Sequence, residues 1–143
     1  MTFDLDKQLK NDSVIIGQFK LCQLLLMNDS QYPWFTLVPM IDGKTEIYQL
    51  NHDDQNQLWT ESRYLSEIIM GHFKGDKLNV AAIGNVVSQL HIHHVVRFKK
   101  DITWPKPVWG QHPMKHYSEA DMAKICLDIK HKLKNCQFFR TYK

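Results

Sequence analysis

The sequence has little of several features that mark specialised classes of protein. Its 143 residues include only three cysteines, too few and odd in number for a disulfide scaffold, so a reducing, cytoplasmic location is expected. The richest apolar run, residues 24–27, is far below the ~18 residues that a membrane-spanning helix needs. The acidic N-terminus lacks the apolar segment of a signal peptide. No repeat, low-complexity segment or glycine- and serine-rich linker is found, so one domain over residues 1–143 is expected, with no membrane partner.

The net charge is also small, at +3 with neutral histidines. It would assist the approach of an anionic small ligand, but it falls well short of a nucleic-acid-binding tail, so no nucleic-acid partner is expected. Hydrophobic residues make up 43% and charged residues 23%, which excludes a mostly disordered chain. Histidine is unusually frequent, with eight in all and three of them within residues 91–94.

Hydrophobic spacing and turn residues predict an α+β fold. Apolar stretches predict strands, and stripes of apolar residues behind capping residues predict helices. The expected strands are 19–27, 35–38, 77–83 and 90–98, and the expected helices are 4–10, 54–73 and 118–135. Asp4, either Asn51 or Asp53, and Ser118 are the expected caps of these helices. Strands that follow one another without regular βα alternation favour an antiparallel sheet.

The histidine cluster lies on the last predicted strand. Alternate side chains of a strand share a face, so Gln89, His91 and His93 should lie on one side and His94 on the other. Neighbours on one face lie about 6.5–7 Å apart. Two imidazoles at this spacing can hold one phosphoryl group, one attacking phosphorus while the other assists the leaving group. His94 should pack beneath the helices as a satisfied, partly buried side chain.

Neutral imidazole is a competent nucleophile near pH 7. Its attacking nitrogen is exposed only if the other nitrogen carries the proton and donates it elsewhere, for example to a backbone carbonyl. The preceding Gly84 and Asn85 form a turn whose main-chain N–H groups can approach an anion.

Two other interpretations of these histidines remain open. They can be an ordinary polar face of a half-exposed strand. A His-X-His pair can also bind a metal, but it needs a third and usually a fourth ligand, and no Cys-X-X-Cys or helical histidine pair accompanies it.

The run 89–95, Gln-Leu-His-Ile-His-His-Val, resembles the alternating motif of the histidine triad (HIT) family of nucleotide hydrolases and transferases. Residues 77–85 resemble the family's preceding strand and phosphate turn, and residues 25–28 and 35–39 resemble its first two strands. Residues 104–110 are similar to the tail of a bacterial branch often labelled diadenosine tetraphosphate hydrolase-like. The resemblance covers about residues 21–110. It implies a HIT-like antiparallel sheet, one long helix between strands and a C-terminal helix.

The resemblance also implies roles for individual residues. His91 corresponds to the nucleophile, which forms a nucleotidyl-histidine that water then hydrolyses. His93 corresponds to the histidine that contacts phosphate oxygens and assists the leaving group. Asn79 and Asn85 fall at phosphate-binding positions, and Asn28 falls near a position that touches the nucleoside.

The sequence departs from the family pattern at three positions. Gln89 replaces the first motif histidine but still offers a donor and an acceptor to phosphate. Trp34 stands where the family has a fourth histidine, and Val86 removes a hydroxyl donor from the phosphate turn.

The resemblance therefore predicts a hydrolase or transferase acting at the α-phosphorus of dinucleoside polyphosphates or nucleoside phosphoramidates. No cofactor and no metal ligand set are expected, although Mg²⁺ can accompany a polyphosphate substrate. A homodimer is also expected. The alternatives are a nucleotide-binding module without catalysis and a metal protein that uses His91 and His93. Trp104 and Trp109 either cover the domain's own core or border a partner's site.

Overall fold

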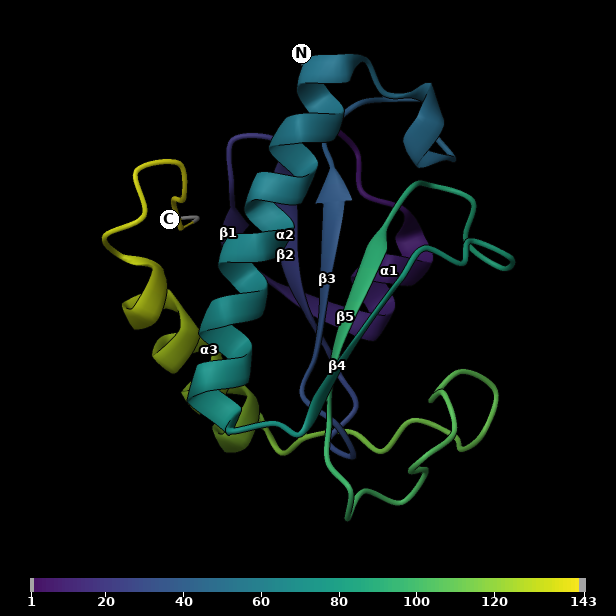
Figure 1. The fold of residues 1–143 in the computed structure, drawn as a ribbon, viewed down its shortest axis with the longest axis vertical. Coiled ribbons are helices and arrows are strands. Elements are labelled where there is room, and N and C mark those ends of the chain that lie inside the picture. The colour runs from purple at the N-terminus through teal and green to yellow at the C-terminus, as the bar shows by residue number, and fades with distance from the viewer. Residues whose placement is uncertain (1, 142–143) are drawn as a thin grey trace.

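The computed structural model describes residues 2–141, which form a five-stranded antiparallel sheet with helices on both faces (Figure 1). The strand order is β1-β2-β3-β5-β4, and the family-like α+β architecture is confirmed. The strands are β1 (Ser13–Gln18), β2 (Cys22–Met27), β3 (Trp34–Pro39), β4 (Lys77–Ala81) and β5 (Ile92–Arg97). The helices are α1 (Lys7–Asp12), α2 (His52–Phe73) and α3 (Glu119–Leu133), with a short 3-10 helix η1 (Ile47–Gln49). Within the described residues, no helix is long and apolar enough to cross a membrane.

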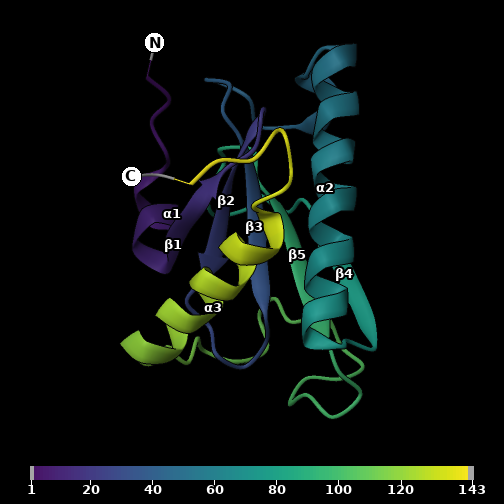
Figure 2. The same ribbon diagram turned by 90° about the vertical axis from the view of Figure 1, so that its left-hand side faces the viewer.

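The two faces of the sheet have different covers. Figure 2 shows α1 and α2 on opposite sides of the strands. The main core lies under α2 and α3, and it includes Leu24 and Leu37 from the central strands. Leu25 and Val38 point the other way and pack against Leu9 of α1. The second face, which α1 covers only in part, carries the candidate site.

Helix starts follow side-chain caps. The side chain of Asn51 accepts a hydrogen bond from the backbone N–H of Asp54 (2.8 Å), so it is Asn51 rather than Asp53 that caps α2. Ser118 caps α3, as predicted. The predicted cap of the first helix is wrong. Asp6 caps α1 instead, because the carboxylate of Asp4 forms an exposed ion pair with Lys10 (2.9 Å).

The strand predictions need three corrections. The predicted strand 19–27 begins only at Cys22, because a turn closed by the Phe19 N–H and the Cys22 carbonyl precedes it. Residues 13–18 form β1, an additional strand that the apolar pattern did not predict. The predicted strands 77–83 and 90–98 shorten to β4 and β5, so residues 82–91 form an irregular loop and His91 lies just before β5.

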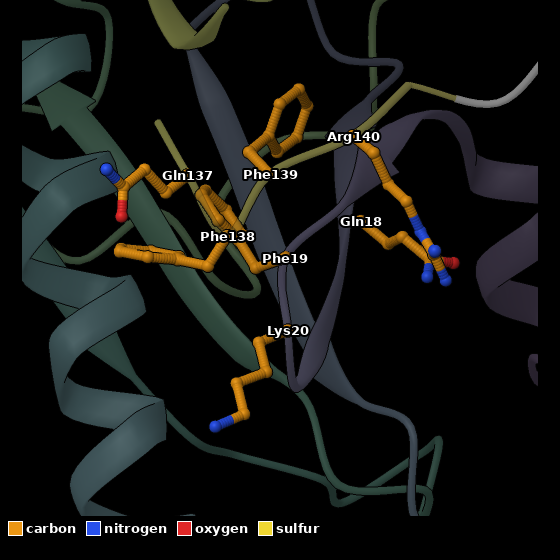
Figure 3. A pocket seen from close by; sticks show the side chains of 7 residues that line it. All are labelled: Gln18, Phe19, Lys20, Gln137, Phe138, Phe139 and Arg140. Atoms are coloured by element: carbon orange, nitrogen blue, oxygen red, sulfur yellow. The ribbon is translucent and has the colours of Figure 1, made fainter. Parts of the chain in front are cut away.

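The C-terminal segment closes against the outer side of β1 (Figure 3). Gln18 and Arg140 exchange two backbone hydrogen bonds of 2.8 and 2.9 Å. A Cβ atom at Gly17 would lie 2.5 Å from the Arg140 carbonyl oxygen, so this approach requires glycine. Phe139 stacks edge-on against Phe19 at a centroid distance of 5.0 Å. The end of β1 is therefore covered by the chain itself.

Candidate active site

A cavity of about 580 Å³ lies on the face of the sheet opposite α2. Its walls come from α1, the ends of β2 and β3, the loop 82–91 and the segment 109–114. His91 and His93 both line it, as do Gly84 and Asn85 of the predicted phosphate turn. The structure thus brings the two histidines and the turn together, as the strand alternation and the motif predict.

His91 has a defined tautomer. Its Nδ1 lies 2.7 Å from the backbone carbonyl oxygen of Gln89. A carbonyl oxygen can only accept a hydrogen bond, so Nδ1 carries the proton of the neutral ring and Nε2 keeps its lone pair. This is the arrangement that a nucleophilic histidine requires.

His93 has the opposite tautomer. The indole N–H of Trp34 donates to Nδ1 of His93 at 2.9 Å, and the Thr36 hydroxyl lies 3.3 Å from the same nitrogen. An indole N–H can only donate, so Nδ1 of His93 is an acceptor and its Nε2 carries the proton. The His91 and His93 rings meet edge to face with centroids 4.7 Å apart. The pair therefore combines one bare nitrogen with one N–H donor.

The surroundings keep His93 neutral. Burial, together with the smaller effects of the neighbouring His91 and His94, lowers its pKa from 6.5 to about 3. At neutral pH the ring thus acts as a hydrogen-bond donor and not as a cation.

His94 lies outside the cavity. Its Nε2 is 2.7 Å from the Ser62 hydroxyl of α2, and its Nδ1 is 3.1 Å from the Ile92 carbonyl oxygen. The side chain is fully buried, and burial lowers its pKa to about 4. The expected satisfied histidine is confirmed, and it anchors β5 to α2.

The predicted phosphate turn has the backbone expected of it. Gly84 has φ +69°, in the left-handed region that favours glycine, next to Asn85. Val86, which replaces the family hydroxyl, is 94% exposed and also lines the cavity. The turn therefore offers main-chain groups and the Asn85 amide, with an apolar rim.

Three predicted contact residues do not line the cavity, and each has at least one side-chain amide atom in a hydrogen bond elsewhere. The Asn79 carbonyl oxygen accepts from Arg97 (2.9 Å) within the β4–β5 pair. The Asn28 carbonyl oxygen accepts from the backbone N–H of Tyr117 (2.9 Å). The Gln89 side chain bonds to the N-terminal segment. The predicted phosphate and nucleoside contacts of Asn79, Asn28 and Gln89 are thus not part of the cavity.

Several lining residues carried no signal in the sequence. Gln8 and Asp12 reach the cavity from α1, whose placement over the sheet depends on contacts distant in sequence. Trp34 was visible only as a departure from the family. Trp109 packs on Trp34 and His93, with ring centroids 5.8 and 5.5 Å away. Trp109 thus packs on side chains of its own chain at the wall of the cavity.

The metal interpretation lacks further ligands. Across residues 2–141, no group of three or more histidine, cysteine, aspartate or glutamate side chains is placed to hold a metal ion. His91 and His93 also use their Nδ1 atoms in hydrogen bonds to Gln89 and Trp34. A metal bound here would have two histidine nitrogens from the protein, short of the four ligands of a typical zinc site.

Comparisons with known proteins agree with this geometry. The model of the family described as HIT domain matches residues 8–100. A histidine triad protein from Marinobacter aquaeolei VT8 has a similar crystal structure, with 45% identity, a TM-score of 0.90, and 94% of this chain and 98% of that chain covered.

Two further crystal structures are similar over nearly their full length. A histidine triad protein from Bradyrhizobium japonicum is 36% identical, with a TM-score of 0.90 and coverage of 92% of this chain and 98% of that chain. One from Sinorhizobium meliloti 1021 is 35% identical, with a TM-score of 0.89 and coverage of 91% and 96%. A search of curated proteins finds no match.

Proposed function

Because the chain belongs to the HIT domain family, we propose that it is a nucleotide hydrolase or transferase whose nucleophile is Nε2 of His91. Proteins of this family are generally nucleotide-binding proteins, hydrolases or transferases. The observation that carries the proposal is the tautomer of His91. The Gln89 carbonyl oxygen lies 2.7 Å from Nδ1 of His91 and keeps the proton on that nitrogen. The lone pair of Nε2 is then free in a cavity that His93 also lines.

The proposed reaction has two displacements. The lone pair of His91 Nε2 attacks the α-phosphorus, and the bond to the leaving group breaks with its electron pair on the departing atom. The nitrogen of a phosphoramidate takes up a proton from solvent water as it departs, so that it leaves as a neutral amine. The ring becomes a phosphorylated imidazolium whose Nδ1–H stays on the Gln89 carbonyl, which stabilises the positive charge. Water then attacks phosphorus, the nitrogen–phosphorus bond breaks, and a nucleoside monophosphate leaves.

His93 supports these steps with a hydrogen bond. Its Nε2–H can bind a non-bridging oxygen or the leaving atom, where negative charge develops. The ring is neutral and its Nδ1 is already occupied by the Trp34 N–H, so the donor keeps its proton through the reaction. Main-chain N–H groups near Gly84 and the amide of Asn85 supply the remaining proposed phosphate contacts.

The proposed substrates are nucleoside phosphoramidates and dinucleoside polyphosphates, the latter in keeping with the resemblance of residues 104–110 to the diadenosine tetraphosphate hydrolase-like branch. Asp12 is the one charged side chain among the described residues that line the cavity, and no lysine or arginine is among them. A long polyphosphate would therefore need Mg²⁺ to offset its charge, and no protein-bound cofactor is proposed. We expect the less charged phosphoramidates to be turned over faster.

The test is a turnover screen over both substrate classes with the wild type and three variants. His91→Ala should abolish turnover and keep nucleotide binding, and acid quenching with a labelled substrate should mark the wild type and not this variant. His93→Ala should lower kcat about 10²–10³-fold, as expected for the loss of one donor to a developing oxyanion. His131→Ala, an exposed histidine of α3, is the matched control. Turnover that survives in His91→Ala would refute the mechanism, and binding without turnover in the wild type would identify a nucleotide-binding module.

We also propose a cytoplasmic homodimer. β4 is the last strand of the sheet, on the far side from the end of β1 that Arg140 covers. Val80 of β4 is 42% exposed on this edge. An open strand edge with apolar side chains can pair with a second copy, and twofold dimers are the commonest assemblies.

A further inference from the structure

Gln89 uses each of its polar groups on a different part of the molecule. Its main-chain carbonyl accepts the Nδ1 proton of His91 at 2.7 Å. Its side-chain Oε1 accepts from the backbone N–H of Asp6 at 2.8 Å, and its Nε2 donates to the backbone carbonyl of Asp4 at 3.0 Å. One residue thus joins the nucleophile to the N-terminal segment.

The main chain around Gln89 has few other restraints. Residues 82–91 form no helix or strand, so no ladder of hydrogen bonds orients the Gln89 carbonyl. The neighbouring Leu90 N–H donates to the Lys44 carbonyl at 2.9 Å, which holds the chain on one side. The side-chain bonds of Gln89 to Asp4 and Asp6 hold it on the other.

The partner segment leads directly into α1, which forms a wall of the cavity. Asp6 caps α1 by accepting from the Gln8 N–H at 2.8 Å. Leu5 and Leu9 are buried against the sheet, with 4% and 3% of their surface exposed. Leu9, together with Gln8 and Asp12 of the same helix, faces the cavity. Any shift of Gln89 would therefore move both this wall and the carbonyl that orients the nucleophile.

We infer that Gln89 is a positioning residue that couples the placement of α1 to the orientation of His91. The inference rests on the proposed function, in which His91 is the nucleophile. It gives the N-terminal segment a part in the reaction although it supplies no reacting group.

The first test replaces Gln89 by methionine, an unbranched side chain of similar length without hydrogen-bonding groups. Two hydrogen bonds are lost, so kcat should fall about 10- to 100-fold. The matched variant Gln89→Glu keeps an acceptor for the Asp6 N–H but loses the donor to Asp4, so its kcat should lie between those of the wild type and Gln89→Met. Long-range ¹H–¹⁵N NMR spectra should show that the His91 Nδ1–H tautomer is less populated in Gln89→Met. Unchanged kcat together with unchanged His91 spectra would overturn the inference.

A second test removes the partner and leaves Gln89 in place. Asp6 has φ −50°, which proline can adopt, and Asp6→Pro deletes the backbone N–H that Gln89 accepts. Asp6→Ala is its control, because it loses the same capping carboxylate and keeps the N–H. In the wild-type background, Asp6→Pro should lower kcat about 3- to 10-fold more than Asp6→Ala does. In the Gln89→Met background, where the side-chain acceptor is already gone, the two substitutions should lower kcat equally. Additive effects would overturn the coupling. If Gln89→Met does not fold, the comparison of Asp6→Pro with Asp6→Ala in the wild-type background decides alone, and equal kcat values there would overturn the coupling.

The two readouts separate this inference from the proposed function. The NMR spectra report the His91 tautomer in a protein that turns over nothing. A wild type without turnover whose His91 spectra still respond to Gln89→Met would refute the proposed function and retain the positioning role. An active wild type whose Gln89 and Asp6 variants leave kcat and the His91 spectra unchanged would retain the proposed function and refute the positioning role.

Discussion

Replacing Trp34 by phenylalanine tests what sets the tautomer of His93. The indole N–H of Trp34 is the donor that makes Nδ1 of His93 an acceptor (2.9 Å), and both side chains are at least nine-tenths buried. Phenylalanine keeps an aromatic ring against His93 and removes this donor. A buried acceptor that loses its partner costs about 1–3 kcal/mol, and the Thr36 hydroxyl at 3.3 Å can recover part of it. We expect Trp34→Phe to lower the free energy of unfolding by about 2 kcal/mol.

Trp109→Phe is the matched control. Trp109 lines the same cavity and contacts the same His93 ring, but its buried indole N–H has no hydrogen-bond partner among residues 2–141. The same change of ring therefore removes no hydrogen bond there. The cost at Trp34 should exceed the cost at Trp109 by at least about 1 kcal/mol, or about 4 °C in Tm for a chain of this size.

The assays are thermal unfolding, single-turnover kinetics and ¹⁵N NMR of His93. Equal sharing of the proton would leave about half of the molecules with the Nε2–H donor, so kcat should fall about twofold in Trp34→Phe. The NMR spectra should show the proton of His93 shared between its two nitrogens in this variant and not in Trp109→Phe. Equal losses of stability in the two variants, with an unchanged His93 tautomer, would refute the reasoning.

Two further predictions concern stability and assembly. The pKa values of about 3 for His93 and about 4 for His94 lie below the ordinary 6.5, so below pH 6.5 the unfolded chain binds more protons than the folded chain. The free energy of unfolding should therefore decrease as the pH is lowered, by about 2 kcal/mol for each histidine between pH 7 and pH 5. Urea unfolding at the two pH values measures this change. The unfolding free energy of His94→Asn should depend less steeply on pH, and a wild-type unfolding free energy that does not change with pH would contradict the prediction. The proposed dimer should be detected by light scattering at micromolar concentration, and Val80→Lys, a charge on the β4 edge, should shift it toward monomer while the control Lys77→Arg does not; a wild-type monomer would contradict the proposal.

Much of the site could be predicted because its signals are local. Strand alternation is a property of a few consecutive residues, and it correctly separated His91 and His93 from His94 even though His91 precedes β5. The caps Asn51 and Ser118 are also local, since each bonds a backbone N–H three residues on. The HIT resemblance then connected these elements into one fold.

The sequence could not place side chains whose partners lie far apart in the chain. Asn28 bonds a residue 89 positions away, and Gln89 bonds residues 83 and 85 positions away. An amide side chain suits phosphate, ribose or backbone equally well, so its type alone does not identify its partner. The same holds for Trp34, whose N–H became informative only when the structure placed it on His93. The strand β1 was not predicted, because the apolar stretch 19–27 favoured one long strand and drew attention away from residues 13–18.

The closure of the C-terminal segment on β1 has a consequence for higher assembly. A sheet with two open edges can add copies without limit and grow into a fibre, as head-to-tail contacts do when they fail to close. Here a copy that approached the end of β1 would meet Arg140 already bonded to Gln18, and the aromatic ring of Phe139 over Gly17. Pairing through β4 alone uses the same surface on both partners, and the assembly is then complete at two. Variants that release residues 138–140 from β1 should therefore be examined for polymerisation as well as for stability.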